Sequence, residues 1–218
     1  CHCFQQKIRE ILYRQSNIED SAGNECFSAF RTDYYSSQRS GRERLSPREN
    51  IENVLSVSRS FIECFDSRPG QNLFIYGNAG VGKTFLSNCI ARALMDSCHS
   101  IIYLTAGEFF DSFKSDDFKE FGSSKFDTSF FVECDLLIID DLGTEKASDY
   151  NFSNLFNTIN ERLLRRKSII ISSNLEMPDI ETRYSQRIFS RLVSAYSILR
   201  LFGDDIRCMK KLSPTKRS

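Results

Sequence analysis

The sequence predicts an α/β fold with a five-stranded parallel sheet flanked by helices on both faces. From residue 71 onward, short apolar runs alternate with amphipathic segments. This alternation is typical of parallel strands that are joined by crossover helices. The 218 residues are enough for one such domain with a full core and a short extension.

The composition of the chain excludes only a few classes of function. Basic and acidic residues both number 29, so the net charge is zero and no overall field would draw the chain to nucleic acid or to a membrane surface. Any contact with DNA must therefore use a local patch. No apolar run approaches the roughly 20 residues that cross a bilayer, and we expect a cytoplasmic protein without membrane contact.

The N-terminal part is expected to form a short helical extension. Apolar residues at helical spacing predict a helix over residues 4–18, and the Ser-rich stretch from about Ser16 to Gly41 predicts a linker. The capping box Ser46-Pro47-Arg48-Glu49 then predicts the start of a helix that runs to about residue 65.

The predicted sheet and its helices follow in regular order. Strands are expected at residues 72–76, 100–104, 135–140, 168–173 and 197–202. Helices are expected at residues 83–96, within 106–133, at 149–166 and within 178–195. In the helix over 149–166, apolar residues keep the 3.6-residue period of an amphipathic helix.

A glycine-rich motif stands between the first strand and the next helix: Gly77-Asn78-Ala79-Gly80-Val81-Gly82-Lys83-Thr84. It matches the P-loop pattern, in which backbone N–H groups surround a phosphate and the helix adds the positive end of its dipole. We expect Lys83 to reach the β- and γ-phosphates of ATP or ADP and Thr84 to place its hydroxyl on Mg²⁺. All eight residues, with Phe85 after them, are predicted to contact the nucleotide.

A second motif, Leu136-Leu137-Ile138-Ile139-Asp140-Asp141, describes a buried strand that ends in two acids. The carboxyl ends of parallel strands face the ligand in open α/β sheets, so these acids should lie near the P-loop. This is a Walker B pattern. We expect Asp140 to hold Mg²⁺, directly or through water, and Asp141 to orient and deprotonate the attacking water.

Three more polar side chains follow the Walker B strand in the sequence. Asn174 comes directly after the strand at 168–173, where it could contact the γ-phosphate or the attacking water, or could instead form an Asx turn. Arg191 lies in a Ser-Arg-Leu sequence, and Arg207 follows the last strand.

In this order the motifs resemble those of AAA+ ATPases of the bacterial helicase-loader family (DnaC/DnaI-like), which includes the IstB transposition helpers. The resemblance covers about residues 44–210. It implies that Asn174 is sensor 1, that Arg207 is sensor 2, and that Arg191 is an arginine finger supplied to a neighbouring subunit. A guanidinium can neutralise charge on the γ-phosphoryl oxygens. Arg187, one helical turn earlier, is the alternative finger.

The resemblance also implies two parts of the chain. Residues 1–43 would be a helix and linker that remain from a lost N-terminal, zinc-ribbon module, and residues 44–218 would be an AAA+ ATPase domain without a full helical lid. Cys1-His2-Cys3 could be the end of that ribbon, although we favour two unpaired thiols and expect no zinc site in this fragment. Asp141 stands where many members carry Glu, so we expect slow hydrolysis.

Candidates for DNA contact are less specific. Four cations cluster at the end of the helix over 149–166, where interaction with the helix dipole or solvent is favoured over phosphate contact: Arg162, Arg165, Arg166 and Lys167. A Phe-rich segment is rich in acids, so packing or protein contact is favoured over stacking on bases: Phe109, Phe110, Phe113, Phe118, Phe121, Phe126, Phe130 and Phe131. The linker aromatics Phe27, Phe30, Tyr34 and Tyr35 could cover the core, which we favour, or contact a nucleotide base.

The function implied by the resemblance is that of a DNA replication helicase loader. Such a protein binds and hydrolyses ATP, self-associates through the arginine finger, and binds single-stranded DNA and a DnaB-type replicative helicase under nucleotide control. An IstB-like transposition helper is the alternative. A P-loop small-molecule kinase or GTPase is more remote, since no Arg-rich lid segment and no N-K-x-D run is found, and a module that only holds ATP is a further possibility.

Overall fold

The computed structural model describes residues 25–39, 41, 43–117 and 128–212. The predicted helix over residues 4–18, the Cys1-His2-Cys3 sequence and three of the eight phenylalanines of the Phe-rich segment lie outside these residues. The 3₁₀ helix η2 (Thr32–Tyr34) lies in the segment where the sequence predicts a linker.

The five predicted strands are present and each is parallel to its neighbours. They are β1 (Leu73–Tyr76), β2 (Ile101–Thr105), β3 (Leu136–Leu142), β4 (Ser168–Ser173) and β5 (Ser197–Arg200). The order across the sheet is β2-β3-β4-β1-β5. This confirms the predicted five-stranded parallel sheet, and it places β4 between the strand that precedes the P-loop and the strand that ends in the two acids.

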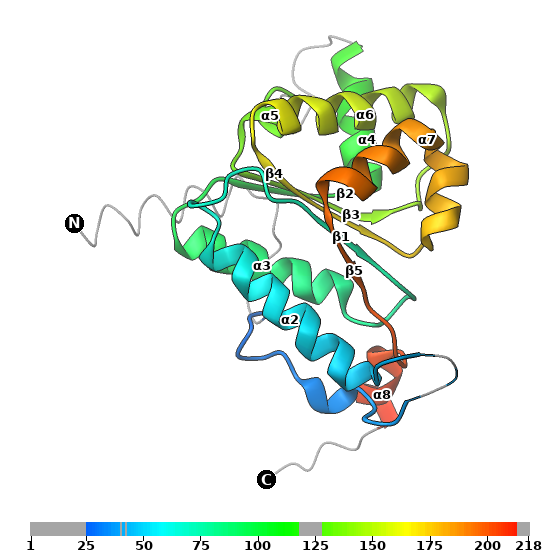
Figure 1. Ribbon diagram of the computed structural model, residues 1–218. Coiled ribbons are helices and arrows are strands. Elements are labelled where there is room, and N and C mark those ends of the chain that lie inside the picture. The colour runs from blue at the N-terminus through cyan, green and yellow to red at the C-terminus, as the bar shows by residue number, and fades with distance from the viewer. Residues whose placement is uncertain (1–24, 40, 42, 118–127, 213–218) are drawn as a thin grey trace, which may run out of the picture.

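Helices cover both faces of the sheet, as predicted (Figure 1). Helices α2 (Pro47–Glu63) and α3 (Lys83–Asp96) lie on one face. The other face carries α4 (Ala106–Asp117), α5 (Phe130–Glu133), α6 (Asp149–Leu164) and α7 (Met177–Ala195). The sequence does not predict α8 (Ile206–Leu212), which has seven residues and lies beside the start of α2 in Figure 1.

Alternate residues of each strand pack into two separate cores. In β1, Leu73 and Ile75 pack with α2 and α3, whereas Phe74 packs on the opposite face. Ile138 and Ile139 of β3 repeat this alternation. Because side chains of a strand alternate between faces, the residue two positions after Ile138 is directed to the α3 face. That residue is the first acid of the Walker B motif.

The predicted capping box at the start of α2 is present. The Ser46 hydroxyl accepts from the backbone N–H of Glu49, and the Glu49 carboxylate accepts from the backbone N–H of Ser46 at 2.7 Å. This backbone hydrogen bond, with further bonds from Arg39 and the Ser46 hydroxyl, lowers the pKa of Glu49 to about 2. The start of α2 is therefore set by local sequence.

The segment that precedes α2 packs on the same core as that helix. Tyr35 is buried, and its hydroxyl donates to the backbone carbonyl of Val81 in the P-loop at 2.8 Å. Phe27, Phe30 and Tyr34 pack against the same core. The favoured prediction that these aromatics cover the core is confirmed, and Tyr35 also fixes the position of the P-loop.

The Phe-rich segment and one residue of the basic cluster, Arg162, meet in the core on the other face. Phe109, Phe110, Phe113 and Phe131 form a set of ring contacts there, as the packing prediction requires, whereas Phe130 is exposed.

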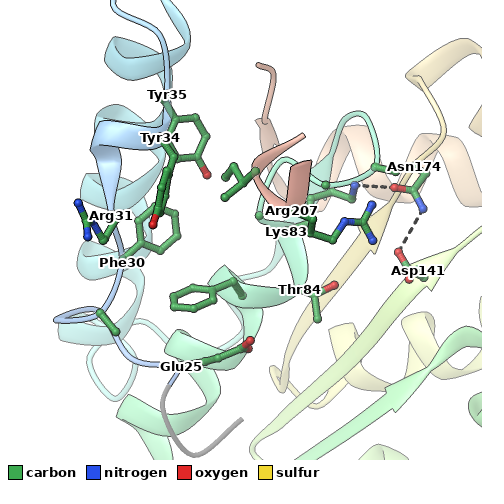
Figure 2. Close-up of a pocket in the computed structure, with 16 residues that line it drawn as sticks. Glu25, Phe30, Arg31, Tyr34, Tyr35, Lys83, Thr84, Asp141, Asn174 and Arg207 are labelled. Carbon is green, nitrogen blue, oxygen red and sulfur yellow. Dashed lines mark hydrogen bonds between the residues drawn. The ribbon is translucent and has the colours of Figure 1, made fainter. Parts of the chain in front are cut away.

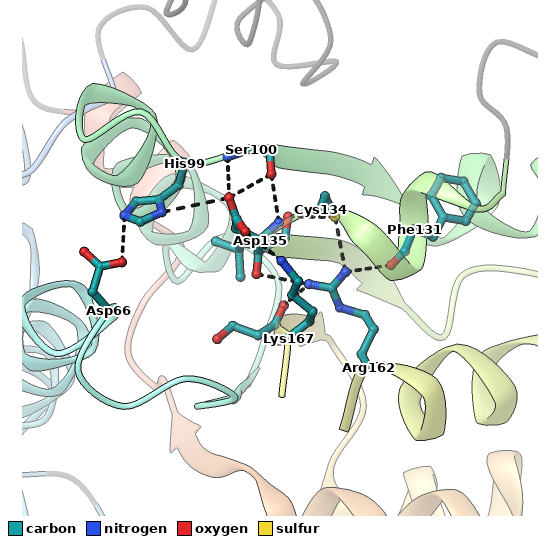
Figure 3. A network of polar contacts seen from close by, with 10 residues as sticks. Asp66, His99, Ser100, Phe131, Cys134, Asp135, Arg162 and Lys167 are labelled. Atoms are coloured by element: carbon teal, nitrogen blue, oxygen red, sulfur yellow. Dashed lines mark hydrogen bonds and ion pairs between the residues drawn. The ribbon is translucent and has the colours of Figure 1, made fainter. Parts of the chain in front are cut away.

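Arg162 belongs to the basic cluster but is fully buried, and Figure 3 shows the polar contacts of its guanidinium. Its guanidinium donates to the backbone carbonyls of Phe131 at 2.7 Å and Ser168 at 2.6 Å. Neither contact with a phosphate nor exposure to solvent describes this residue, because it joins α6 to the segments that enter β3 and β4. Lys167 pairs with Asp135 at 2.8 Å.

We predict that Arg162→Ala lowers the free energy of unfolding by about 3 kcal/mol or more, because it leaves several buried carbonyls without a donor. Arg165→Ala is the control. Arg165 is exposed and pairs with Glu161 at 3.6 Å on the surface of α6, so its removal should change stability by less than about 1 kcal/mol. Urea unfolding of both variants measures the difference, and equal midpoints would contradict a structural role for Arg162.

Candidate nucleotide-binding site

A cavity of about 480 Å³ opens at the carboxyl end of the sheet. Its volume lies within the range of small-molecule sites. The P-loop, the segment before α2, the ends of β3 and β4 and the start of α8 surround it (Figure 2). The residues that line it are Glu25, Ala29, Phe30, Arg31, Tyr34, Tyr35, Ala79, Gly80, Gly82, Lys83, Thr84, Phe85, Asp141, Asn174, Ile206 and Arg207.

The P-loop backbone is held between the cavity and the chain that follows β5. Gly77 and Gly80 have φ angles of 140° and 79°, which glycine adopts without strain. A Cβ atom on Gly77 would lie 1.9 Å from the carbonyl oxygen of Leu201, and one on Gly80 would lie 2.1 Å from Cγ of Asp205. The backbone N–H of Ile206 donates to the carbonyl of Gly80 at 3.0 Å. Segment 201–206 therefore contacts the loop directly.

Lys83 begins α3 and is directed back across the loop. Its Nζ atom donates to the carbonyls of Gly77 and Asn78, both at 2.8 Å, and to Oδ1 of Asn174 at 2.6 Å. Burial lowers the pKa of Lys83. Among the predicted nucleotide contacts, Gly77, Asn78 and Val81 do not line the cavity, and the first two support Lys83 through their carbonyls.

Thr84 and Asp140 lie in direct contact. The Thr84 hydroxyl donates to Oδ2 of Asp140 at 2.9 Å, and Asp140 is 3% exposed. Two more hydroxyls reach the same carboxylate: Tyr103 of β2 donates to Oδ2 at 2.9 Å, and Ser172 of β4 donates to Oδ1. Burial and the negative charge of Asp140 raise the pKa of Tyr103 well above its usual value, so the phenol keeps its proton.

The Thr84–Asp140 pair fits a magnesium site. Mg²⁺ in such sites takes one or two carboxylates and completes its shell with water and substrate phosphates. The Thr84 hydroxyl lines the cavity and the buried Asp140 carboxylate lies directly behind it, so together they would supply the protein's share of such a shell. In the part of the chain that the structure describes, no group of three or more His, Cys, Asp or Glu side chains could form an all-protein cage.

Asp141 lies at an irregularity of β3. The register with β4 shifts between Ile139 and Leu142, and Asp141 has a φ of 56°, which Asp tolerates better than most residues. The shift leaves Asp141 half-buried at the cavity. Burial, followed by the charge of Asp140, raises the pKa of Asp141.

Asn174 joins the two sides of the site. Its Nδ2 atom donates to Oδ1 of Asp141 at 3.2 Å while its Oδ1 atom accepts from Lys83. The alternative prediction, an Asx turn at Asn174, is not what closes strand β4. The hydroxyl of Ser173 accepts from the backbone N–H of Leu175 at 3.1 Å and makes that turn.

The two predicted arginines lie in different places. Arg207 lines the cavity beside Lys83 and forms a two-point contact with Asp205, at 3.3 Å and 3.2 Å. Arg191 lies on α7, outside the cavity, and its side chain is exposed. Within the described residues no hydrogen bond or ion pair holds that side chain. Arg187 is also exposed on α7.

Helix α7 is broken and tied to the loop that follows Asp141. Ser185 has a φ of 80°, which interrupts the helix. Just before the break, the Tyr184 hydroxyl donates to the Glu145 carboxylate, and Arg183 donates to the Glu145 carbonyl. Glu145 in turn accepts from the backbone N–H of Gly143 at 2.9 Å.

The far end of the cavity is aromatic. Phe30 contacts Phe85 edge to face, with ring centroids 5.4 Å apart, and Tyr34 lines the cavity nearby. Phe30 and Tyr34 thus pack on the core, as favoured, and also border the cavity, so their contact with a nucleotide base stays a prediction. Tyr103, Ser172 and Asp205 are site residues that sequence patterns did not identify. For Tyr103 and Ser172 the sequence did hold one signal. Because side chains alternate between the two faces of a strand, their positions in the predicted strands could have placed them on the same face as Asp140.

A P-loop after β1, two acids at the end of β3 and the strand order β2-β3-β4-β1-β5 define the class of AAA+ P-loop ATPases. The model of the bacterial DnaA ATPase domain family matches residues 56–198, and the chain belongs to this family of replication-initiation ATPases.

Known relatives agree with this assignment. The chromosomal replication initiator protein DnaA of Wolbachia sp. subsp. Brugia malayi (strain TRS) is 29% identical over 149 residues, which are 65% of this chain and 31% of that protein. The chain thus spans about a third of this relative's length.

Two solved structures share the fold. A DnaC helicase loader has a TM-score of 0.66 at 21% identity, covering 84% of this chain and 100% of that chain. A replication initiator DnaA bound to AMPPCP and single-stranded DNA has a TM-score of 0.58 at 22% identity, covering 80% of this chain and 59% of that chain. No helix within the described ranges is both long and apolar enough to cross a membrane.

We predict that Asp141→Asn stabilises the chain without nucleotide at pH 7. A carboxyl whose pKa is raised by folding opposes folding when ionised, and the penalty disappears as the pH falls toward the unfolded value of about 4. The stability gain of Asp141→Asn should therefore shrink between pH 7 and pH 4. Urea unfolding in EDTA at several pH values measures it.

Asp135→Asn is the control of opposite sign. Burial opposes ionisation of Asp135, but its bonds to Lys167 and Ser100 outweigh burial and lower its pKa. Its ionised form stabilises the fold at pH 7, and this contribution is lost as the pH falls through the lowered pKa. Asp135→Asn should destabilise at pH 7 and approach wild type in acid. A loss of stability for Asp141→Asn at pH 7 would contradict the first expectation.

Proposed function

We propose that the chain binds ATP with Mg²⁺, hydrolyses it slowly, and acts as a helicase loader in DNA replication. The observation that carries this proposal is the arrangement at the carboxyl edge of the sheet. There Asn174 bridges Lys83 and Asp141, while Thr84 meets Asp140 beside the same cavity. These are the groups that phosphoryl transfer from ATP to water requires.

Each residue has a proposed role. Lys83 would leave the loop carbonyls for the β- and γ-phosphates, and Thr84 with Asp140 would hold Mg²⁺. The cation, when bound, would neutralise charge on the phosphates. Arg207 would exchange Asp205 for a phosphate oxygen. Phe85, with the aromatic end of the cavity, would contact the base.

Asp141 is proposed as the group that orients the attacking water and accepts its proton. Its raised pKa brings it nearer to the working pH of a general base. Asn174 fixes the carboxylate through its amide hydrogen. Because Asp is one methylene shorter than Glu, the water would be held less closely, which supports slow turnover.

Arg191 is proposed as an arginine finger for a neighbouring molecule. Its exposed position on α7, away from the cavity of its own chain, supports action in trans, and α7 is tied through Tyr184 and Glu145 to the loop after Asp141. Nucleotide-dependent self-association would follow.

The partners are proposed from the relatives. Membership of a replication-initiation family and the likeness to a DnaC helicase loader support a replicative helicase of the DnaB type, and the DnaA structure with single-stranded DNA supports a DNA ligand. We further propose that residues 44–218 are the ATPase domain and that residues 1–43 are the remainder of an N-terminal part, of which residues 25–39 pack against the ATPase domain. An IstB-like transposition helper and a small-molecule kinase are the alternatives, and neither is favoured by a specific feature of the site.

We predict trans-complementation between Lys83→Ala and Arg191→Ala chains. Each variant alone should lose ATPase activity by about 100-fold or more, the first because it cannot hold the phosphates and the second because each site lacks its finger. In a mixture, a Lys83→Ala chain still offers Arg191 to the intact cavity of its neighbour, so activity should return. Arg187→Ala is the control for position and should retain activity alone. No recovery in the mixture would contradict a shared site.

We predict that ATP with Mg²⁺ strengthens binding of single-stranded DNA relative to ADP, by about fivefold or more, because assembly joins several DNA-binding surfaces. Fluorescence anisotropy at matched salt measures this for single-stranded and duplex oligonucleotides. Tighter binding of duplex would favour a transposition helper, and phosphate transfer to a nucleoside in a parallel assay would favour a kinase.

A further inference from the structure

The carboxylate of Asp140 is surrounded by hydroxyls from three different elements. Its Oδ2 atom accepts from Thr84 of α3 and from Tyr103 of β2, each at 2.9 Å, and its Oδ1 atom accepts from Ser172 of β4. Only Thr84 belongs to a sequence motif of the site. Tyr103 and Ser172 are buried and lie on the face of the sheet that α3 covers.

Of the three donors, Thr84 is the one whose oxygen also faces the proposed cation site. A hydroxyl has one hydrogen and two lone pairs. While Thr84 gives its hydrogen to Asp140, both lone pairs of its oxygen remain available on the other side. If the Asp140 carboxylate turned, Thr84 would lose this acceptor and its hydroxyl could rotate. The direction of the Thr84 lone pairs therefore depends on the orientation of Asp140.

That orientation is fixed from behind the site. Tyr103 contacts one carboxylate oxygen and Ser172 the other, so rotation about the Cβ–Cγ bond of Asp140 would break at least one of these hydrogen bonds. Ser172 also accepts from the backbone N–H of Asp141 at 2.9 Å, which links the same hydroxyl to the second acid.

We propose that Tyr103 and Ser172 are positioning residues for the magnesium site. They hold Asp140 in the orientation that takes the hydrogen of Thr84 and leaves the Thr84 oxygen free for the cation. This inference rests on the proposed function. It adds two residues that act through Asp140 rather than on the nucleotide, as partners of metal ligands do elsewhere.

The test is Tyr103→Phe, which keeps the buried ring and removes only the hydroxyl. Binding of a fluorescent ATP analogue is titrated with Mg²⁺, and the same affinity is measured in EDTA. We expect the Mg²⁺ concentration for half-maximal tightening to rise about tenfold, as removal of such partners typically does. The affinity in EDTA should stay at the wild-type value, because the P-loop contacts are unchanged.

Tyr196→Phe is the matched control. The Tyr196 hydroxyl is also buried, but it has no hydrogen-bond partner in the described structure. The same chemical change there should leave the Mg²⁺ titration as in wild type. Ser172→Ala is the second variant, and it should shift the titration in the same direction as Tyr103→Phe. It also keeps the inference testable if thermal melting shows that Tyr103→Phe does not fold.

The outcomes separate this inference from the proposed function. If wild type binds the analogue more tightly with Mg²⁺, but both variants follow its titration, the positioning role is wrong. It is also wrong if the variants lose affinity equally with and without Mg²⁺, because that is the effect of a general structural loss. If wild type binds no analogue at all, the proposed function fails instead.

Discussion

The structure at the carboxyl edge of the sheet depends on the burial of one charged group, the carboxylate of Asp140. A buried carboxylate is strongly unfavourable unless hydrogen bonds replace its water. Here β2, β4 and α3 each supply a hydroxyl, through Tyr103, Ser172 and Thr84. Those three elements meet β3 at a single point, so satisfying one acid also sets where the helix of the P-loop begins relative to the sheet.

The strand order explains how the P-loop and the acidic end of β3 are linked by hydrogen bonds. Because β4 lies between β1 and β3, the residue that follows it has Lys83 on one side and Asp141 on the other. An amide suits that place, because its oxygen accepts from the Lys83 ammonium and its nitrogen donates to the Asp141 carboxylate. Asn174 therefore has an acceptor for the positive group on one side and a donor for the negative group on the other. A carboxylate has no donor for Asp141, and an aliphatic side chain has neither group.

Sequence patterns predicted what depends on neighbouring residues. The alternation of apolar runs gave the five strands, and local motifs gave the P-loop, the two acids and the capping box of α2. Tyr103, Ser172 and Asp205 depend on the register between distant segments, which no single motif encodes. The prediction that Arg162 interacts with the helix dipole or solvent was wrong for the same reason. The basic run in which it lies does not reveal the backbone carbonyls that surround its guanidinium. The role of Arg191 stays a prediction, since its partner would be another molecule.

Two constraints require glycine in the P-loop, one from the ligand and one from the protein itself. The usual explanation is the close approach of a phosphate, but the chain after β5 already occupies the space beside Gly77 and Gly80. A side chain at Gly77 would collide with the backbone of Leu201, and one at Gly80 would displace the Asp205 carboxylate at a positive φ that glycine adopts without strain. A glycine variant of this loop would therefore confuse loss of folding with loss of binding. Substitutions of Lys83 and Thr84 avoid this backbone problem, but each removes a side chain that also holds parts of the site together.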